Sequence, residues 1–299
     1  LEFFLERVNE MIPQDAVALH PLMGAKGTYS QERISHWDQV AAKDRWGIAS
    51  GYYQKRLSAV FQNLVPAHSR VLELGCGKGD LLVSLRPSRG VGIDFSPRMI
   101  ADGRQRHPDL CLIQADVHDL ALHLEGEKFD YVILSDLLND LWDIQQVLEQ
   151  THQVCHPGTR IIFNFYSRLW QAPLLLAQKI GLARPVLPQN WITKNDLNNF
   201  LSLVGFEVIR QWNEILFPFP VPVLAELFNR IGAKVWPLLE LALANIVVAR
   251  PAGASINQQK RPTVSVVVPT RNEAGNIENI LQRVPEMGEG TEIIFVEGN

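Results

Sequence analysis

The chain of 299 residues is 46% hydrophobic and 20% charged, with a formal net charge of −4. This composition excludes an intrinsically disordered chain and allows a sizeable core to be buried. The acidic balance argues against a general nucleic-acid binder, which usually carries a basic face. Residues 1–10 mix apolar and charged side chains, so they lack the basic start and apolar stretch of a signal peptide. We therefore expect a globular cytoplasmic protein that does not bind nucleic acid.

The cysteines support the same expectation. Cys76, Cys111 and Cys155 are odd in number and lie far apart in the chain. They offer neither a disulfide framework nor the spacing of a zinc site, and they suit a reducing compartment. The sequence predicts reduced thiols and no bound metal.

The first part of the chain, residues 1–64, is predicted to be helical, with a glycine-containing loop at residues 23–28. An apolar strand at residues 71–74 then enters a glycine-rich turn that holds Gly75, Gly77 and Gly79. Glycines in such a turn let the backbone bend tightly and approach a ligand closely. On their own they would also suit an ordinary turn between a strand and a helix.

A second apolar strand at residues 91–93 ends at Asp94. Parallel pairing of the two strands would place the Asp94 carboxylate beside the glycine turn, where it can accept both ribose hydroxyl hydrogens. The turn reads E-L-G-C-G-K-G, which differs from the G-x-G-x-x-G pattern that binds a pyrophosphate. Glu73 would repel a pyrophosphate and attract a cation. S-adenosylmethionine, which carries a sulfonium and an ammonium, is therefore favoured over a dinucleotide.

These motifs, with QADVHDL and FDYVILSDLLNDLWD after them, resemble those of the class I S-adenosylmethionine-dependent methyltransferases over roughly residues 50–250. The resemblance implies that Asp94 binds the ribose, that Asp116 binds the adenine amino group, and that the Val117 amide binds a ring nitrogen. The strand end at residues 135–137 would face the methionine part. The full set of implied cofactor contacts is Tyr52, Glu73, Gly75, Cys76, Gly77, Asp94, Phe95, Met99, Asp116, Val117, Ser135, Asp136 and Leu137.

Short apolar runs alternate with helical patterns along the same region, which predicts an α/β fold with a doubly wound, Rossmann-like sheet and helices on both faces. A helix is expected at residues 194–204. The final strands are expected at residues 206–212 and 245–249, with the last one antiparallel. In methyltransferases of this class the preceding helices often cover the cofactor, so residues 1–64 are expected to include a lid. Plain packing of its aromatic residues against the sheet is the alternative.

Methyl transfer is an in-line displacement, so aligned reactants in a water-poor site supply much of the acceleration. If the acceptor is a hydroxyl, a base must take its proton. Asp140, His156 and Tyr166 are the candidates expected near the carboxyl ends of the strands. Asn139 and Asp140 are also expected to contact the substrate. Alternatively, Asp140 and Asp143 compete to cap the helix that follows.

The segment between the last two strands is predicted to hold an amphipathic helix, with apolar residues on one face of residues 223–231. It could cap an apolar substrate, form a homodimer, touch a membrane surface transiently, or simply pack on the core. Charged residues such as Glu226 and Arg230 exclude a transmembrane span.

The C-terminal part changes character after a polar linker at residues 253–262. Residues 263–299 resemble the opening of a family 2 glycosyltransferase with the GT-A fold, which binds a nucleotide-sugar. The resemblance would place Glu273 and Glu297 near the nucleotide. Such enzymes hold a divalent metal with an Asp-x-Asp motif, and Asp196 is the last aspartate of this chain. Glycosyltransferase activity is therefore not expected from these residues alone.

The predicted organisation is a helical cap (1–64), a methyltransferase domain (65–252), a linker (253–262) and a glycosyltransferase fragment (263–299). The predicted function is S-adenosylmethionine-dependent methyl transfer to a small-molecule, glycan or glycolipid acceptor, within a bifunctional protein. The alternative is a cofactor-binding or scaffolding module that serves a glycosyltransferase domain.

Overall fold

The computed structural model divides into two compact units, residues 1–251 and 252–299, and each is considered by itself. The residues that it describes are 14–42, 48–124, 126–179, 187–216, 241–253, 263–271 and 274–297.

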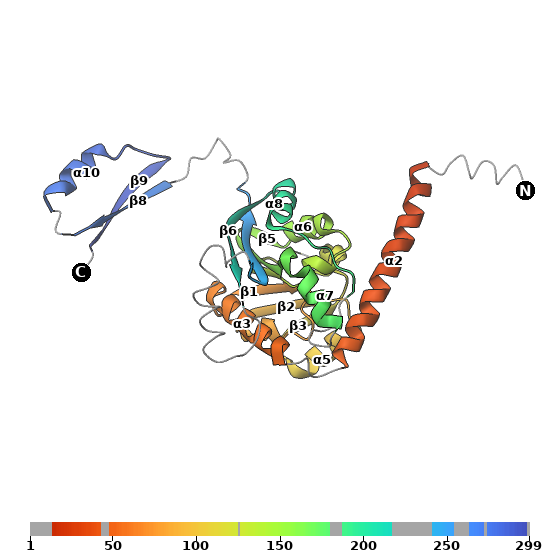
Figure 1. Ribbon diagram of the computed structural model, residues 1–299. Coiled ribbons are helices and arrows are strands. Elements are labelled where there is room, and N and C mark those ends of the chain that lie inside the picture. Colours follow the sequence, from red (N-terminus) through yellow and green to blue (C-terminus); the bar gives the residue numbers. More distant parts are fainter. Residues whose placement is uncertain are drawn as a thin grey trace, which may run out of the picture. The chain divides into compact units, whose positions relative to one another are not determined.

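In the first unit, the predicted apolar runs form a seven-stranded sheet in the order β3-β2-β1-β4-β5-β7-β6 (Figure 1). Strands β1 to β5 pair in parallel, and β7 pairs antiparallel with both β5 and β6. The predicted doubly wound sheet and its antiparallel last strand are confirmed. The strands are β1 (Arg70–Leu74), β2 (Arg89–Asp94), β3 (Cys111–Gln114), β4 (Phe129–Ser135), β5 (Cys155–Tyr166), β6 (Phe206–Glu214) and β7 (Ala244–Pro251).

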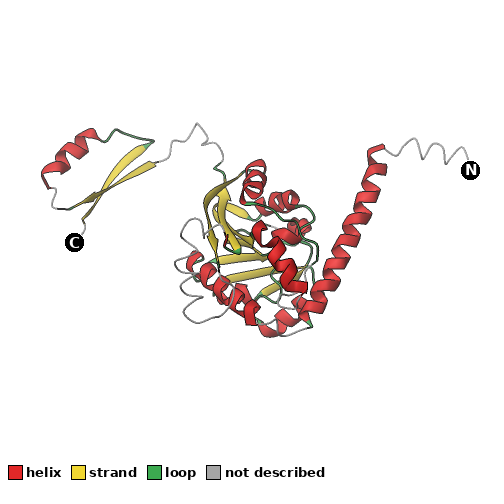
Figure 2. Ribbon diagram, viewed as in Figure 1, coloured by secondary structure: helices red, strands yellow, loops and turns green. Residues whose placement is uncertain are grey.

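Helices cover both faces of this sheet (Figure 2). Because side chains alternate along a strand, Leu72 and Leu74 of β1 pack on one face while Val71 packs on the other. The first face is covered by η1 (Val117–Leu122), α6 (Ile144–His152) and α8 (Lys194–Leu203). The second is covered by α3 (Ile48–Leu64), α4 (Asp80–Ser84) and α5 (Pro97–Arg106). The short helices η2 (Leu138–Asp140) and η3 (Arg168–Trp170), and helix α7 (Gln171–Lys179), follow strand ends.

The N-terminal part contains one long helix, α2 (Gln14–Ala41). The loop predicted at residues 23–28 is wrong, because α2 runs through Gly24 and Gly27 without a break. Glycine in a helix interior costs only about 0.5–1 kcal/mol relative to alanine, and Thr28 Oγ1 donates to the Gly24 carbonyl at 3.1 Å. The C-terminal end of α2 packs on α5, where Val40 and Ala41 contact Met99. Packing of the C-terminal end of α2 thus offsets the weak helical propensity of the two glycines in its middle.

The predicted amphipathic helix at residues 223–231 lies outside the described residues. Its role in substrate capping, dimerisation or membrane contact therefore stays a prediction. Of the helices that the structure describes, none combines the length and the apolar character needed to cross a bilayer.

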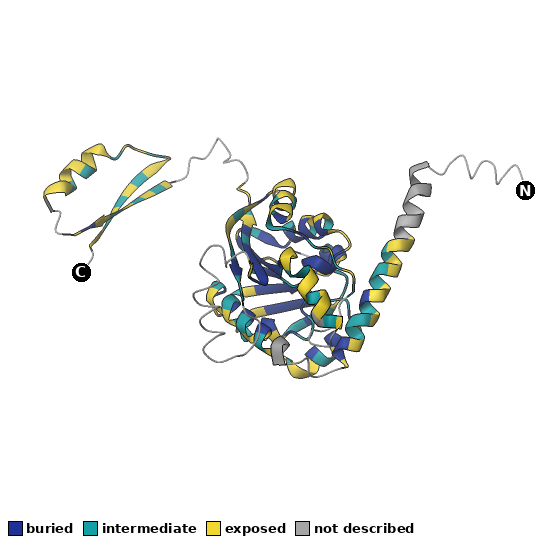
Figure 3. Ribbon diagram, viewed as in Figure 1, coloured by how far each residue is buried: buried dark blue, intermediate teal, exposed yellow. Residues whose placement is uncertain are grey.

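The second unit consists of β8 (Thr263–Thr270), η6 (Ala274–Asn276), α10 (Ile277–Arg283) and β9 (Gly290–Glu297). Strands β8 and β9 pair in parallel, with Thr270 opposite Glu297. Thr270 is the only buried residue among those whose exposure is described in this unit (Figure 3). Two strands and a short helix cannot bury a core of their own. Glu273 lies outside the described residues.

Candidate active site

The glycine-rich turn after β1 requires its glycines. Gly75, Gly77 and Gly79 have φ of 70°, 53° and 81°, in the left-handed region that side chains disfavour. A Cβ on Gly75 would lie 2.8 Å from Cδ1 of Leu137, so a larger residue would clash there. The amide of Gly77 donates to Oδ2 of Asp94 at 2.9 Å. The turn therefore brings bare backbone against the acid at the end of β2, as the sequence predicts.

Asp94 is held by backbone amides on both of its oxygens. Oδ2 accepts from Gly77, and Oδ1 accepts from the Ser96 amide at 2.9 Å. Burial raises the pKa of Asp94 to about 6, although the hydrogen bonds from Ser96 and Gly77 oppose this shift. The carboxyl is thus fixed in place and ionises close to neutral pH.

A cavity of about 210 Å³ lies at the carboxyl ends of β1, β2, β3 and β4. Pockets that enclose drug-sized ligands typically have about 300–1,000 Å³, so a ligand of that size would extend beyond this space. The cavity is lined by Tyr29, Ser30, Arg33, Ile34, Gly75, Asp94, Phe95, Gln114, Ala115, Asp116, Val117, His118, Leu137, Asp140, Leu141 and Trp142. Seven of the predicted site residues therefore line one cavity: Gly75, Asp94, Phe95, Asp116, Val117, Leu137 and Asp140.

Asp116 and His118 form a hydrogen-bonded pair in the cavity wall. Oδ1 of Asp116 accepts from the His118 amide at 2.9 Å and lies 2.6 Å from His118 Nδ1. On its other side, His118 Nε2 accepts from the Asp143 amide at 3.1 Å. Burial would raise the pKa of Asp116, but the hydrogen bonds from His118 lower it overall. His118 is not among the residues predicted from the sequence.

Helix α2 supplies another wall of the cavity. Arg33 is only 3% exposed, and its guanidinium lies 3.5 Å from the centre of the Tyr29 ring. Arg33 Nε lies 3.8 Å from Oδ1 of Asp140, and Nη2 donates to the Pro188 carbonyl at 2.6 Å. The Tyr29 hydroxyl donates to the Asp140 carbonyl at 3.3 Å. These contacts attach α2 to the segment after β4, and none of the α2 residues in the wall was predicted.

Asp136, after β4, accepts from two buried side chains. Its Oδ1 accepts from the Tyr53 hydroxyl at 2.8 Å and from Asn164 Nδ2 at 2.6 Å. Burial raises the pKa of Tyr53 well above its usual value, and the neighbouring Asp136 adds to this shift. Tyr53 faces the sheet and makes this contact, whereas the cofactor contact of the neighbouring Tyr52 stays a prediction. Asp136 itself has φ of 51°, a strained conformation that often occurs at functional sites.

Three predicted cofactor contacts lie in the core, outside the cavity lining. Alternation along β1 directs Glu73 toward the face covered by α4, where it is 3% exposed. Glu73 Oε2 has no hydrogen-bond partner, and burial raises the pKa of Glu73 well above its usual value. Cys76 and Met99 are buried as well. Burial therefore keeps these side chains out of the cavity lining, and Ser135 and Gly77 also lie outside it. Their contacts with the cofactor stay predictions.

The other predicted polar residues fall into different environments. Asp143 caps α6 by accepting from the Gln146 amide at 2.9 Å, so Asp140 is not the cap. Asn139 is 1% exposed, and its amide donates to the Asn190 carbonyl at 2.8 Å, away from the cavity lining. Tyr166 is half-buried, with its ring centre 5.8 Å from that of Tyr53. Of the candidate bases, only Asp140 lines the cavity.

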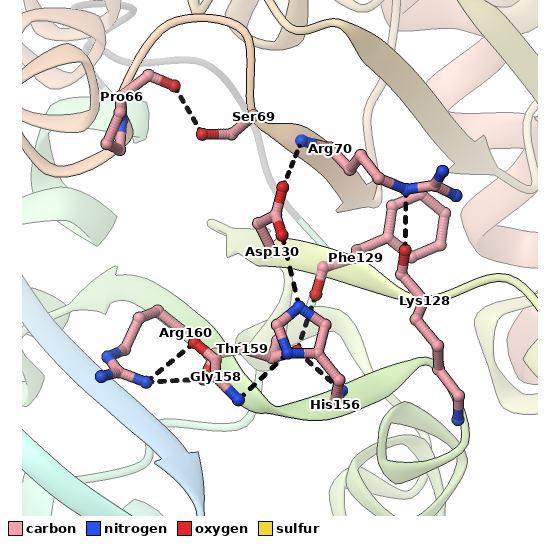
Figure 4. Close-up of polar contacts among 10 residues, drawn as sticks. All are labelled: Pro66, Ser69, Arg70, Lys128, Phe129, Asp130, His156, Gly158, Thr159 and Arg160. Carbon is pink, nitrogen blue, oxygen red and sulfur yellow. Dashed lines mark hydrogen bonds and ion pairs between the residues drawn. The ribbon is translucent and has the colours of Figure 1, made fainter.

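The predicted position of His156 is wrong. His156 lies at the start of β5, because β5 begins at Cys155, which pairs with Phe129. Figure 4 shows His156 beside Asp130, with Nε2 3.3 Å from Oδ1, and the Arg70 amide donates to Oδ2 of Asp130 at 2.8 Å. This cluster joins the starts of β1, β4 and β5. Because these strands pair in parallel, the cluster lies at the opposite end of the strands from Asp94 and Asp136.

We therefore expect His156→Ala to leave cofactor affinity unchanged and to cost about 0–1 kcal/mol of unfolding free energy, because both partners of this ion pair are more than one-third exposed. Urea denaturation and titration with S-adenosylhomocysteine would measure the two quantities. A folded His156→Ala protein that no longer binds the ligand would return His156 to the active site.

Comparison with known proteins agrees with this geometry. Residues 66–205 match a family described as a methyltransferase domain. A demethylmenaquinone methyltransferase of Oceanobacillus iheyensis is 35% identical over 106 residues, 33% of this chain and 44% of that protein. A probable S-adenosylmethionine-dependent methyltransferase of Mycolicibacterium smegmatis is 28% identical over 197 residues, 63% of this chain and 71% of that protein.

Residues 66–205 are thus similar in sequence to known methyltransferase domains. Solved structures agree on the fold of this domain. An S-adenosylmethionine-dependent methyltransferase of Thermotoga maritima has a TM-score of 0.57 and 15% identity, covering 73% of this chain and 99% of that one. A Haloferax volcanii methyltransferase, solved with the Trm112 activator, has a TM-score of 0.53 and 18% identity, covering 72% and 97%.

The methyltransferase domain should bind its cofactor in a pH-dependent way through Asp94. Because the pKa of Asp94 is about 6, protonation below this pH removes the negative charge that ribose hydroxyls would donate to. Affinity for S-adenosylhomocysteine should be constant above about pH 7 and fall about tenfold per pH unit well below pH 6. Calorimetry from pH 5 to 8 would measure this.

The Asp94→Asn variant provides the control for this titration, since its amide does not ionise in that range. Asp116 does not account for such a step, because its pKa is lowered and it stays ionised. An affinity in the unsubstituted protein that is flat from pH 5 to 8 would contradict the assignment of Asp94 to the ribose.

Proposed function

We propose that this chain transfers the methyl group of S-adenosylmethionine to a small-molecule acceptor. The observation that carries the proposal is the convergence of the glycine turn, Asp94 and Asp116 on one cavity. A charged acceptor for ribose hydroxyls and a charged acceptor for the adenine amino group are thereby present on the same wall.

The cofactor supplies a methyl group activated by attachment to a sulfonium. Asp94 is proposed to bind the ribose, Asp116 the adenine amino group, and Asp136 the methionine ammonium. Leu137, Leu141 and Trp142 would exclude water from the site, which strengthens these polar contacts. The proton of a hydroxyl acceptor would pass to Asp140, the candidate base that lines the cavity.

The acceptor is proposed to be a small amphipathic molecule. The aromatic rings of Tyr29 and Trp142 contact each other edge-on, with centres 5.1 Å apart, in the cavity wall, and such a surface suits an apolar ring or chain. The Oceanobacillus iheyensis relative is named for a quinone precursor. The resemblance of residues 263–299 to a nucleotide-sugar enzyme points instead to a glycan or glycolipid acceptor and a bifunctional protein. The parallel β8–α10–β9 unit is compatible with that second class.

Two measurements test the proposal. Calorimetry with S-adenosylhomocysteine should give one binding site per chain. Transfer of labelled methyl from S-adenosylmethionine should then be assayed with demethylated naphthoquinols, sugar nucleotides and lipid-linked sugars. Absence of binding in a folded chain would refute the proposal. Binding without transfer to any of these acceptors would favour the alternative of a scaffolding module.

A further inference from the structure

His118 is a buried side chain, 5% exposed, that joins two segments of the cavity wall. It follows β3, and its Nδ1 lies 2.6 Å from Oδ1 of Asp116. Its Nε2 lies 3.1 Å from the amide nitrogen of Asp143, the residue that caps α6. The Gln146 side chain also donates to the His118 carbonyl, at 3.2 Å. His118 therefore connects the adenine side of the cavity with the segment after β4.

The donors around the imidazole determine where its hydrogen lies. A backbone amide can only donate, so Nε2 must accept from Asp143 and carries no hydrogen. The ring hydrogen is therefore on Nδ1, which donates to Asp116. A second hydrogen on Nε2 would face the amide hydrogen of Asp143, so the contact to α6 requires the neutral ring.

These contacts orient the Asp116 carboxylate. Both donors from His118, its amide and its Nδ1, end on Oδ1, which leaves Oδ2 for an amino group in the cavity. We propose that His118 is a positioning residue that sets the selectivity of the site for the 6-amino group of the cofactor. This inference rests on the proposed binding of S-adenosylmethionine.

The contact between His118 and Asp143 also leads to the cavity wall that α2 forms. Asp143 follows directly on the segment that contains Asp140, and Asp140 pairs with Arg33 of α2. The orientation of Asp116 is thereby linked through His118 to the wall formed by α2 and residues 137–142. A substitution of His118 should therefore change the affinity for the adenine base while the fold is kept.

The test compares S-adenosylhomocysteine with its inosine analogue, in which a carbonyl replaces the 6-amino group. The unsubstituted chain should prefer the amino form by roughly tenfold or more, since a carbonyl cannot donate to Asp116. His118→Asn places an amide nitrogen near the position of Nδ1 and should keep most of this preference. His118→Gln places its amide near Nε2 instead and should lose most of the preference contributed by Asp116. The Val117 amide contributes equally in all three proteins.

Equal preference in the Asn and Gln variants would overturn the inference, whereas failure of the unsubstituted chain to bind either ligand would refute the proposed function itself. Thermal unfolding of each variant monitors the fold. Nitrogen NMR of the unsubstituted protein gives a readout that does not depend on the variants. It should show the hydrogen of His118 on Nδ1, and a hydrogen on Nε2 alone would also overturn the inference.

Discussion

Replacing Asp94 with alanine should weaken the binding of S-adenosylhomocysteine by roughly 100-fold, because two hydrogen bonds to a charged acceptor are lost. The substitution also frees the amides of Gly77 and Ser96, which both donate to Asp94, so the turn that faces the cofactor loses its support. Isothermal titration calorimetry would measure the dissociation constants. Asp94→Asn should fall between the two proteins, since an amide keeps one acceptor oxygen.

Asp130→Ala is the matched control for this loss. Asp130 is also an aspartate of the sheet, but it lies near the start of β4 with His156, at the opposite end of the strands from Asp94 (Figure 4). The Asp130→Ala protein should bind S-adenosylhomocysteine as tightly as the unsubstituted chain. Equal affinity in a folded Asp94→Ala protein would remove Asp94 from the cofactor site.

Replacing Asp136 with asparagine should weaken S-adenosylhomocysteine by roughly tenfold to 100-fold and leave 5′-methylthioadenosine unchanged. The second ligand lacks the amino and carboxyl groups of the methionine part, so it cannot use the negative charge of Asp136. Asparagine tolerates the left-handed backbone at this position, where φ is 51°. It can still accept from Tyr53 and Asn164 through its remaining oxygen. Competition binding with both ligands would measure the effect.

Asp116→Asn is the comparison for Asp136→Asn, because the adenine is common to both ligands. It should weaken S-adenosylhomocysteine and 5′-methylthioadenosine alike. If Asp136→Asn also weakened both ligands equally, Asp136 would act on the shape of the site and not on the ammonium group.

The sheet and the convergence of Asp94 and Asp116 on one cavity were predictable because the relevant signals are local. Asp94 and Asp116 each follow a short apolar strand, and parallel strands bring their carboxyl ends to one edge. Tyr53 could also have been found. It lies four residues before Leu57 and eight before Phe61, and all three are buried, so the apolar stripe of α3 identifies Tyr53 and not Tyr52 as the inward residue.

Other parts of the site depend on contacts between distant segments, which no local pattern reports. Arg33 and Asp140 are paired across the cavity, and neither neighbourhood shows that the other is close. Placing His156 correctly requires the first residue of β5. The apolar run that predicts this strand begins only at Ile161, so the predicted start is too late. The strand reaches back to Cys155, which pairs with Phe129, across Pro157 and Gly158, which are residue types depleted in strands.

The buried Glu73 has a different pKa in the folded and in the unfolded chain. Its pKa is raised well above the usual value by burial, whereas in the unfolded chain it would ionise as an ordinary glutamate. At a pH between the unfolded and the folded pKa, folding therefore takes up a proton at Glu73, and unfolding releases it. The contribution of Glu73 to stability is fully present below its unfolded pKa and is lost as the pH rises through its folded value. The strand that carries the glycine turn therefore holds a carboxyl whose contribution to stability depends on pH.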